Sequence, residues 1–473
     1  MGALFHDEAL FAPNEPQASL ARALYDTIAD LPIVSPHGHT DPAWYAENAP
    51  FPDPATLLVV PDHYVFRMLV SHGVRLEDLG VPRRDGGPVE TDPRAIWRLF
   101  AEHWHVFRGT PTRLWLDYTF QNLFGLEVPL SARTADRYYD TIAEALASDA
   151  FRPRALFERF RIEAIATTEG ALDDLRHHRA LRAEGWPGRV ITTYRPDGVI
   201  DPEMEGFAEA LDRLGEITGA DTGRFAGYLE AHRIRRRFFR EAGGATATDH
   251  GFASAQTANL PFAEAAALYD RIRAGKAREG DAALFRAQML TEMARMSVED
   301  GMVMQIHPGS FRNHNSAVHA AFGRDKGFDI PTRTDYVHAL RPLLEAVGME
   351  PGLTIVLFTL DESAYARELA PLAGAYPCLK LGPPWWFHDS VEGMLRFREA
   401  ATETAGFYNT VGFNDDTRAF PSIPARHDVA RRVDCRFLAG LVADHRLRED
   451  EAFELARALA YELPRRAYKL DTP

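Results

Sequence analysis

Short apolar, β-rich runs recur along the chain, and each is followed by a longer amphipathic stretch. Stretches such as 336–347, 365–373 and 391–404 repeat apolar residues every three or four positions, which predicts helices with one buried face. A short apolar run can also be a buried helix segment, but eight strand–helix repeats favour a closed TIM-type (β/α)8 barrel, an α/β fold, over an open sheet. The runs interpreted as strands are 33–39, 162–168, 190–194, 245–249, 302–307, 354–359, 378–381 and 408–414.

The spacing of the predicted strands is uneven, and the longest gap separates the first strand from the second. This gap has mostly helical patterns, with Pro and Gly residues at 81–93 that indicate a loop. We interpret it as a helical insertion over the barrel mouth. The predicted parts of the chain are 1–52, with an N-terminal helix and the first strand, 53–160, the insertion, and 161–473, the rest of the barrel with extra C-terminal helices.

The acidic composition narrows the classes of partner. Lys plus Arg number 53 against 68 Asp plus Glu, a net charge of −15, which repels nucleic acid and anionic membranes, so neither is expected as a partner. Only two cysteines occur, and neither a signal peptide nor an apolar run of about 18 residues is found, so we expect a cytoplasmic protein. A chain of 473 residues buries a large core unaided, so any bound metal should be catalytic.

The first predicted strand runs into His37-Gly38-His39. Residues i and i+2 of a strand share one face, so both imidazoles can converge on one metal ion at the catalytic mouth of a barrel. Neutral imidazole suits zinc, manganese, iron or cobalt. The alternative is two unrelated polar residues in a loop, which the apolar strand before them disfavours.

Two charged residues follow the eighth predicted strand. Asp416 and Arg418 are two positions apart and can point into the same cavity. Because strands one and eight are neighbours in a closed barrel, the Asp416 carboxylate can complete a metal site with His37 and His39. A charged loop that caps the next helix is the alternative.

Other polar and aromatic residues follow the remaining strands or begin the insertion, where barrel enzymes carry their active-site loops. His307 can contact the metal or the substrate, or be a hydrogen-bonded core histidine. The two tryptophans after the seventh strand form either a pocket wall or part of the core. These candidates are His63, Tyr64, Arg195, Asp249, His307, Arg312, Trp385 and Trp386.

The order and spacing of these motifs resemble the uronate isomerases, an outlying branch of the amidohydrolase superfamily, over almost the whole chain. The resemblance implies a (β/α)8 barrel that interconverts glucuronate with fructuronate and galacturonate with tagaturonate. It also implies one divalent metal ion, for which we expect zinc, and a hexuronate as the small-molecule partner; a homo-oligomer is compatible with it. The shared motifs are H-G-H, D-H-Y with a following Arg, T-T-E, R-P-D, D-H-G, Q-I-H-P-G-x-x-R-N, W-W-F, D-D-T-R and R-H-D.

The resemblance also implies roles for single residues. The metal ligands would be His37, His39 and Asp416, with His307 either a fourth ligand or a substrate contact. Dinuclear hydrolases of the superfamily carry a carboxylated lysine on the fourth strand, and the absence of lysine there disfavours a second metal. The positions that resemble substrate-binding arginines are Arg195, Arg312 and Arg418, and the other pocket positions are His63, Tyr64, Asp249, Trp385 and Trp386.

The chemistry of such an isomerase suggests a role for several of these residues. Aldose–ketose isomerisation opens the sugar ring, removes a proton from C2 and returns one to C1 through an enediolate. A metal or a cationic donor stabilises charge on the enediolate oxygens, and an arginine can clamp the uronate carboxylate. We expect Tyr64 to be the base at C2, with its phenol pKa lowered by an arginine or the metal. Asp416 could then handle the hydroxyl proton during ring opening.

Two other functions would use part of the same set of residues. A hydrolase of the superfamily, cleaving a lactone, amide or ester, would share His37, His39 and Asp416, although the three arginines and the missing lysine favour the isomerase. A non-catalytic sugar-acid binding protein would not need intact metal ligands.

Overall fold

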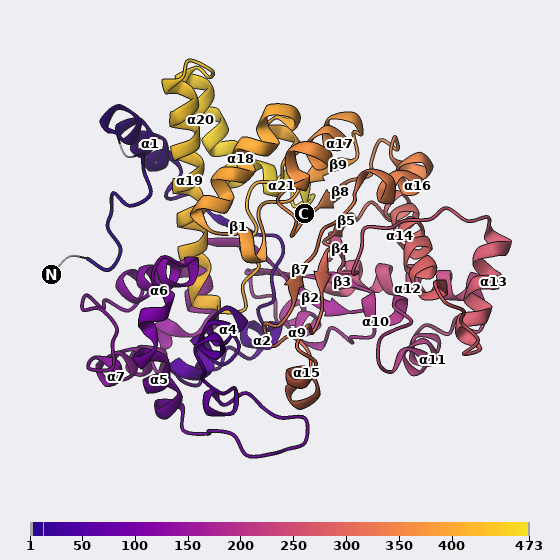
Figure 1. Cartoon of the computed structure of the whole chain (residues 1–473), viewed down its shortest axis with the longest axis horizontal. Coiled ribbons are helices and arrows are strands. Elements are labelled where there is room, and N and C mark those ends of the chain that lie inside the picture. The colour runs from indigo at the N-terminus through magenta and orange to yellow at the C-terminus, as the bar shows by residue number, and fades with distance from the viewer. Residues whose placement is uncertain (1–2, 13, 472–473) are drawn as a thin grey trace.

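The computed structural model describes residues 3–12 and 14–471, and a parallel sheet lies at its centre (Figure 1). Seven strands pair in the order β1-β2-β3-β4-β5-β8-β9, and every neighbouring pair is parallel. With the helices that connect them, they form an α/β barrel of the TIM type. The strands are β1 (Ile33–Ser35), β2 (Ile162–Gly170), β3 (Arg189–Arg195), β4 (Ala247–His250), β5 (Val303–Ile306), β8 (Ile355–Leu357) and β9 (Leu379–Leu381).

The eighth member of the ring is an extended segment rather than a regular strand. Residues 408–414, predicted as a strand, make a single parallel bridge from Thr410 to β9. Gly412 has a φ of 80°, outside the strand region, and this conformation interrupts the ladder. The prediction of a regular eighth strand is therefore wrong. The two ends of the ring meet instead through a backbone hydrogen bond of 3.1 Å, which the His39 amide donates to the Thr417 carbonyl.

Amphipathic helices pack around the strands of the second half of the chain and share one apolar core with β5 and β8. The predicted helices at 336–347 and 391–404 are confirmed as α16 and α18, while 365–373 begins as a π-helical turn and continues into α17. The helices of this part are α9 (Arg176–Glu184), α10 (Asp197–Ile200), α11 (Phe207–Thr218), α12 (Phe225–Gly243), α13 (Phe262–Arg273), α14 (Asp281–Asp300), α15 (Ser316–Phe322), α16 (Val337–Val347), α17 (Ala370–Ala375) and α18 (Val391–Ala405).

Short helices fill the gap between β1 and β2 and gather on one side of the molecule (Figure 1). They pack into an aromatic-rich core that also includes residues of β1 and β2. Most begin at an Asp or Thr whose side chain accepts a hydrogen bond from the first turn, and usually a Pro follows, which is a typical helix start. They are α2 (Pro42–Glu47), α3 (Pro54–Leu58), α4 (His63–Ser71), α5 (Pro93–Glu102), α6 (Pro111–Asn122), α7 (Ala135–Leu146) and α8 (Pro153–Arg159).

The two ends of the chain pack together. Helix α1 (Glu15–Ile28) lies against α19 (Ile423–Ala443) and α20 (Glu449–Arg457), with which it shares an apolar cluster. The last helix, α21 (Leu463–Ala467), leads into Tyr468 and Leu470, which enter the apolar interior of the barrel. No helix among the described residues combines the length and the apolar character that crossing a membrane requires.

Candidate active site and metal centre

A cavity of about 630 Å³ opens at the ends of the strands and collects most of the predicted site residues. Asp249 is the exception, because it is fully buried and does not line the cavity. The predicted residues that line it are His37, His39, His63, Tyr64, Arg195, His307, Arg312, Trp385, Trp386, Asp416 and Arg418.

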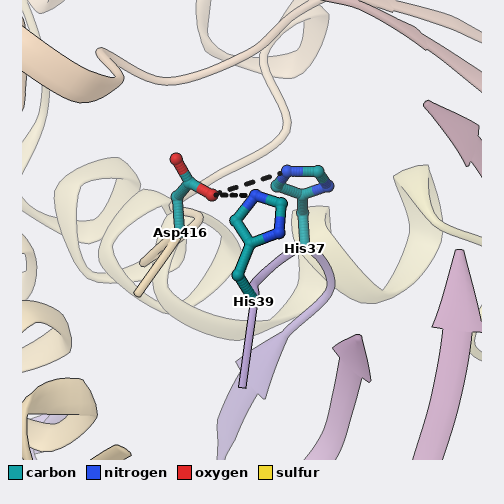
Figure 2. Close-up of side chains that lie close together, drawn as sticks. All are labelled: His37, His39 and Asp416. Atoms are coloured by element: carbon teal, nitrogen blue, oxygen red, sulfur yellow. Dashed lines mark ion pairs between the residues drawn. The ribbon is translucent and has the colours of Figure 1, made fainter. Parts of the chain in front are cut away.

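His37, His39 and Asp416 form one group whose ligand atoms lie within 4.8 Å of one another, and this group could hold a metal ion (Figure 2). The Asp416 Oδ1 atom lies 3.5 Å from His37 Nε2 and 3.2 Å from His39 Nε2. The histidines do not share a strand face as predicted, because β1 ends at Ser35, before Pro36, which has no N–H to donate to the ladder. The loop turns both rings toward Asp416 instead.

Asp416 is held in an unusual position. Its φ of 44° lies in the left-handed region, which non-glycine residues seldom adopt and which is common at functional sites. The Trp385 indole N–H donates to Oδ2, which leaves Oδ1 facing the histidines. Oδ1 is buried and has no hydrogen bond among the described residues. A buried carboxylate oxygen that lies between two imidazole nitrogens and makes no hydrogen bond fits a divalent cation.

The electrostatics of the group also suit a cation. Burial would raise the pKa of Asp416, but contact with His39 and the proximity of His37 lower it below its ordinary value, so the carboxylate is ionised. Burial lowers the pKa of His39, although Asp416 opposes this, so the imidazole tends to be neutral with a free lone pair. An ionised carboxylate and a neutral imidazole are the forms that bind metals.

His307 points to a carboxylate outside the metal group. Its Nε2 atom lies 2.6 Å from Asp249 Oδ1, and Arg195 Nη1 lies 3.5 Å from Asp249 Oδ2. Arg195 Nε also donates to Asp197 at 3.0 Å. Burial would raise the pKa of Asp249, but His307, His37 and Arg195 hold it well below its ordinary value. Asp249 therefore acts from beneath the cavity by holding His307 and Arg195.

The other two predicted arginines differ in how far they are already paired. Arg312 donates to Asp329 at 2.9 Å, and its guanidinium lies 5.4 Å from the centre of the Trp386 ring. Arg418, by contrast, has no carboxylate within 4.0 Å among the described residues. Burial would raise the pKa of Asp325, another lining residue, but the charge of Arg418 lowers it below its ordinary value. Arg418 thus acts on Asp325 without forming an ion pair with it, and its guanidinium can take a carboxylate from solution.

Tyr64 has a different setting from the one expected. Its hydroxyl donates to Asp389 Oδ2 at 3.2 Å, and Arg426 Nη1 donates to the same oxygen at 3.3 Å. Burial raises the pKa of Tyr64 well above 10, the Asp389 charge raises it further, and Arg426 opposes this only in part. The expected lowering of the Tyr64 pKa is therefore wrong. Neighbouring His63 is held neutral, since burial and then Arg418 lower its pKa to about 3.

The sequence interpretation missed Arg426 and Asp389 as site residues. Arg426 lines the cavity, lies 3.8 Å from the centre of the Trp115 ring, and donates to the Asp415 carbonyl at 3.0 Å. Burial raises the pKa of Asp389 to about 6, although Arg426 opposes this. The sequence does contain a signal for both residues, because Asp389 comes two residues after the W-W-F motif and Arg426 is the first residue of the R-H-D motif.

Comparisons with known proteins identify relatives of this chain. The sequence model of the glucuronate isomerase family matches residues 9–468. A uronate isomerase of Mesorhizobium japonicum is 70% identical over 470 residues, which cover 99% of this chain and 100% of that protein. The structure of a glucuronate isomerase from Caulobacter crescentus is 59% identical, with a TM-score of 0.98 over 100% of this chain and 98% of that one.

The fold is also shared at lower identity. A uronate isomerase from Thermotoga maritima is 26% identical but superimposes with a TM-score of 0.91 over 98% of this chain and 99% of that one. These similarities favour the isomerase over the hydrolase and the binding protein considered from the sequence. Because the family match and the relatives extend over nearly the whole chain, the chain belongs to the uronate isomerase family.

Proposed function

We propose that this uronate isomerase interconverts D-glucuronate with D-fructuronate and D-galacturonate with D-tagaturonate in the cavity at the barrel mouth. One observation carries the proposal: the His–His–Asp group and the Arg418 guanidinium, which has no ion pair among the described residues, line the same cavity. A hexuronate is complementary to both, because it has an anionic carboxylate at one end and carbonyl and hydroxyl oxygens at the other.

The metal that we propose is a single zinc ion, held by His37, His39 and Asp416. Two imidazole nitrogens and one carboxylate oxygen suit zinc, and also manganese, iron and cobalt. Such an ion would polarise the sugar oxygens at C1 and C2 and stabilise the negative charge that develops on them. In this proposal Asp416 also accepts the hydroxyl proton when the sugar ring opens.

The arginines would orient the substrate. Arg418 would bind the uronate carboxylate through two parallel N–H···O bonds, and the guanidinium of Arg312, fixed by Asp329, would add positive charge at the same end. Arg195, held by Asp197 and Asp249, would contact a sugar hydroxyl together with His307. Trp385 and Trp386 would form the wall of the pocket.

Tyr64 would transfer the proton at C2 with the help of Asp389. A phenol whose pKa is raised stays protonated at neutral pH and cannot accept a proton by itself, but its hydroxyl donates to Asp389, which can take the phenol proton as the phenol oxygen takes the proton from C2. The Asp389 pKa of about 6 is suitable for holding that proton transiently. The same pair, working in reverse, would return a proton at C1 of the enediolate.

The insertion 53–160 would cover the mouth of the barrel. Helix α4 begins at His63, and both His63 and Tyr64 line the cavity, so the insertion contributes directly to its wall. A cover of this kind would keep bulk water away from the enediolate.

A coupled assay of uronate interconversion tests the function. Purified protein should convert glucuronate and galacturonate to their keturonates and leave a panel of sugar lactones unhydrolysed. Lactone hydrolysis without uronate turnover would replace the proposed reaction by that of a hydrolase.

A further inference from the structure

A side chain from the end of the chain lies inside the barrel. Tyr468 is fully buried in an apolar cluster made mostly by the barrel strands. Barrel interiors usually hold bulky branched residues, but here the strands contribute small ones at Ala164, Ala166 and Ala247. Tyr468 therefore fills space that short side chains leave in the core.

The Tyr468 hydroxyl belongs to a chain of buried hydrogen bonds that ends at a metal-ligand candidate. Asn414 Nδ2 donates to the hydroxyl at 2.7 Å, and the hydroxyl donates to Gln305 Oε1 at 2.9 Å. Gln305 Nε2 in turn lies 3.3 Å from His37 Nδ1. Both Gln305 and Tyr468 have no exposed surface, so no solvent competes for these bonds.

The donor-to-acceptor direction of these hydrogen bonds decides which nitrogen of His37 carries the proton. The Nε2 atom faces Asp416, so a metal at that position needs the Nε2 lone pair and a proton on Nδ1. A proton on Nδ1 needs an acceptor. The Gln305 Nε2 that now faces Nδ1 is a donor, which favours the other tautomer.

This series of hydrogen bonds can reverse its direction while the same residues stay connected. A half-turn of the Gln305 amide brings Oε1 to His37 Nδ1 and Nε2 to the Tyr468 oxygen. A half-turn of Asn414 then lets its Oδ1, which is buried and has no partner among the described residues, accept from the Tyr468 hydroxyl. The reversal gives up the long 3.4 Å contact of Gln305 with the Thr248 carbonyl, and it moves Asn414 Nδ2 from the Tyr468 hydroxyl to the place that Oδ1 now occupies. A hydroxyl suits this point of the chain because it donates and accepts in either direction.

We propose that Tyr468, acting through Gln305, is a positioning residue that holds His37 in its metal-binding tautomer, so that the C-terminal segment completes the metal site from inside the barrel. This inference rests on the proposed metal site and goes beyond it, because neither Tyr468 nor Gln305 lines the cavity or touches substrate. Outer-shell hydrogen bonds of this kind typically change metal affinity by about 10- to 100-fold when removed.

Zinc affinity of the full-length protein tests the inference without any assay of activity. After removal of metal with a chelator, zinc is titrated against a chromophoric competitor in the wild type and in Tyr468→Phe. The phenyl ring still fills the core, so the fold should persist, while zinc affinity should fall by about 10- to 100-fold. Circular dichroism and thermal unfolding in chelator should show that the metal-free variant is folded.

Tyr461→Phe is the matched control. It removes a tyrosine hydroxyl from the same C-terminal segment, one that donates to Glu163 at 2.5 Å and is not part of the chain to His37. Its zinc affinity should equal that of the wild type. A loss as large as that of Tyr468→Phe would show that the effect is a general weakening of this segment and would overturn the inference.

A double-mutant cycle tests the route. Gln305→Leu should weaken zinc binding at least as much as Tyr468→Phe, and adding Tyr468→Phe to it should change the affinity by no more than about threefold. Additive losses, or a Tyr468→Phe protein with wild-type zinc affinity, would contradict the inference while leaving the metal site in place. A wild-type protein that binds no zinc would instead overturn the proposed metal centre, and the inference with it.

Discussion

At the scale of single residues, the cavity combines groups that are already paired with groups that are not. Asp329 and Asp197 hold Arg312 and Arg195, whereas Arg418 has no carboxylate partner among the described residues. Asp416 is similar, since Trp385 holds one of its oxygens and the other faces two histidines without a hydrogen bond. Charged side chains that lack a partner, beside others that are held by ion pairs or hydrogen bonds, are typical of binding sites.

Replacing Arg418 by lysine tests the carboxylate clamp. The change Arg418→Lys keeps the positive charge but loses the two-pronged geometry, so kcat/KM for uronates should fall by the equivalent of roughly 2–4 kcal/mol. Arg396→Lys is the control, because Arg396 is an exposed residue of α18 that pairs with Glu362. This change should alter kcat/KM little. Wild-type kcat/KM in Arg418→Lys would place the clamp elsewhere.

Removing the Tyr64 hydroxyl tests the proton transfer. Tyr64→Phe should lower kcat by about 10²- to 10⁴-fold and slow the exchange of the C2 hydrogen with deuterated water to the same degree. Metal content should stay at the wild-type level, because Tyr64 is not in the His–His–Asp group. Asp389→Asn should slow the same exchange if Asp389 takes the phenol proton. Exchange at the wild-type rate in Tyr64→Phe would make Asp416 the next base to test.

Glu169 gives a prediction about stability and pH. Burial raises its pKa from about 4.5 to about 7, although Thr192 and Thr167 donate to the carboxylate. The folded state therefore holds a proton that the unfolded state loses, and the wild type loses stability as pH rises between about 4.5 and 7. Glu169→Gln lacks this titration. Between about pH 4.5 and pH 7 its free energy of unfolding should therefore rise by about 3 kcal/mol relative to that of the wild type.

Denaturant unfolding of both proteins across the pH range provides the measurement. Glu403→Gln, at an exposed position of α18, serves as the control and should follow the wild-type curve. Parallel curves for Glu169→Gln and the wild type would mean that Glu169 is ionised when the protein is folded.

At the scale of elements, periodicity predicted the helices well and the strand ends poorly. The patterns at 336–347 and 391–404 match α16 and α18 because each buries one regular face. β1 is shorter than the apolar run that predicted it, because Pro36 ends the ladder. The eighth strand failed at Gly412, whose backbone conformation does not show in a pattern of apolar residues.

The site was predictable in composition but not in geometry. Motif order brought eleven of the lining residues into one set, yet the approach of Asp416 to the histidines depends on its left-handed backbone and on the Trp385 hydrogen bond. Asp389 and Arg426 were missed because their roles depend on a tertiary contact with Tyr64, which the nearby W-W-F and R-H-D motifs do not reveal.

The N-cap of α4 lies next to Tyr64, the proposed base. Asp62 accepts from the Tyr64 amide at 2.8 Å and fixes the start of the helix that carries Tyr64. Asp62→Ala should cost about 1 kcal/mol of stability and also lower kcat. Asp53→Ala removes the equivalent cap of α3 and should cost similar stability with little effect on kcat. Equal effects of both changes on kcat would mean that the position of α4 does not matter for catalysis.

At the scale of the whole molecule, the cavity gathers arginines within an acidic chain. The net charge of the chain is −15, and the cavity is lined by five arginines and six aspartates, so an arginine without an ion pair among the described residues, rather than the net charge of the cavity, gives an anionic sugar a local reason to bind. The barrel collects these arginines from residues 195–426 and brings them together with metal-ligand candidates from its first and last strand segments. The cytoplasmic location and the homo-oligomer stay predictions. The five arginines are Arg195, Arg312, Arg324, Arg418 and Arg426.

Metal removal and return is the most direct test of the claim that this chain is a metal-dependent uronate isomerase. The protein as purified should contain about one divalent ion per chain by elemental analysis. Dialysis against a chelator should abolish glucuronate isomerisation together with the ion, and one equivalent of zinc, manganese or cobalt should restore it. Full turnover by protein shown to be free of metal would contradict the account.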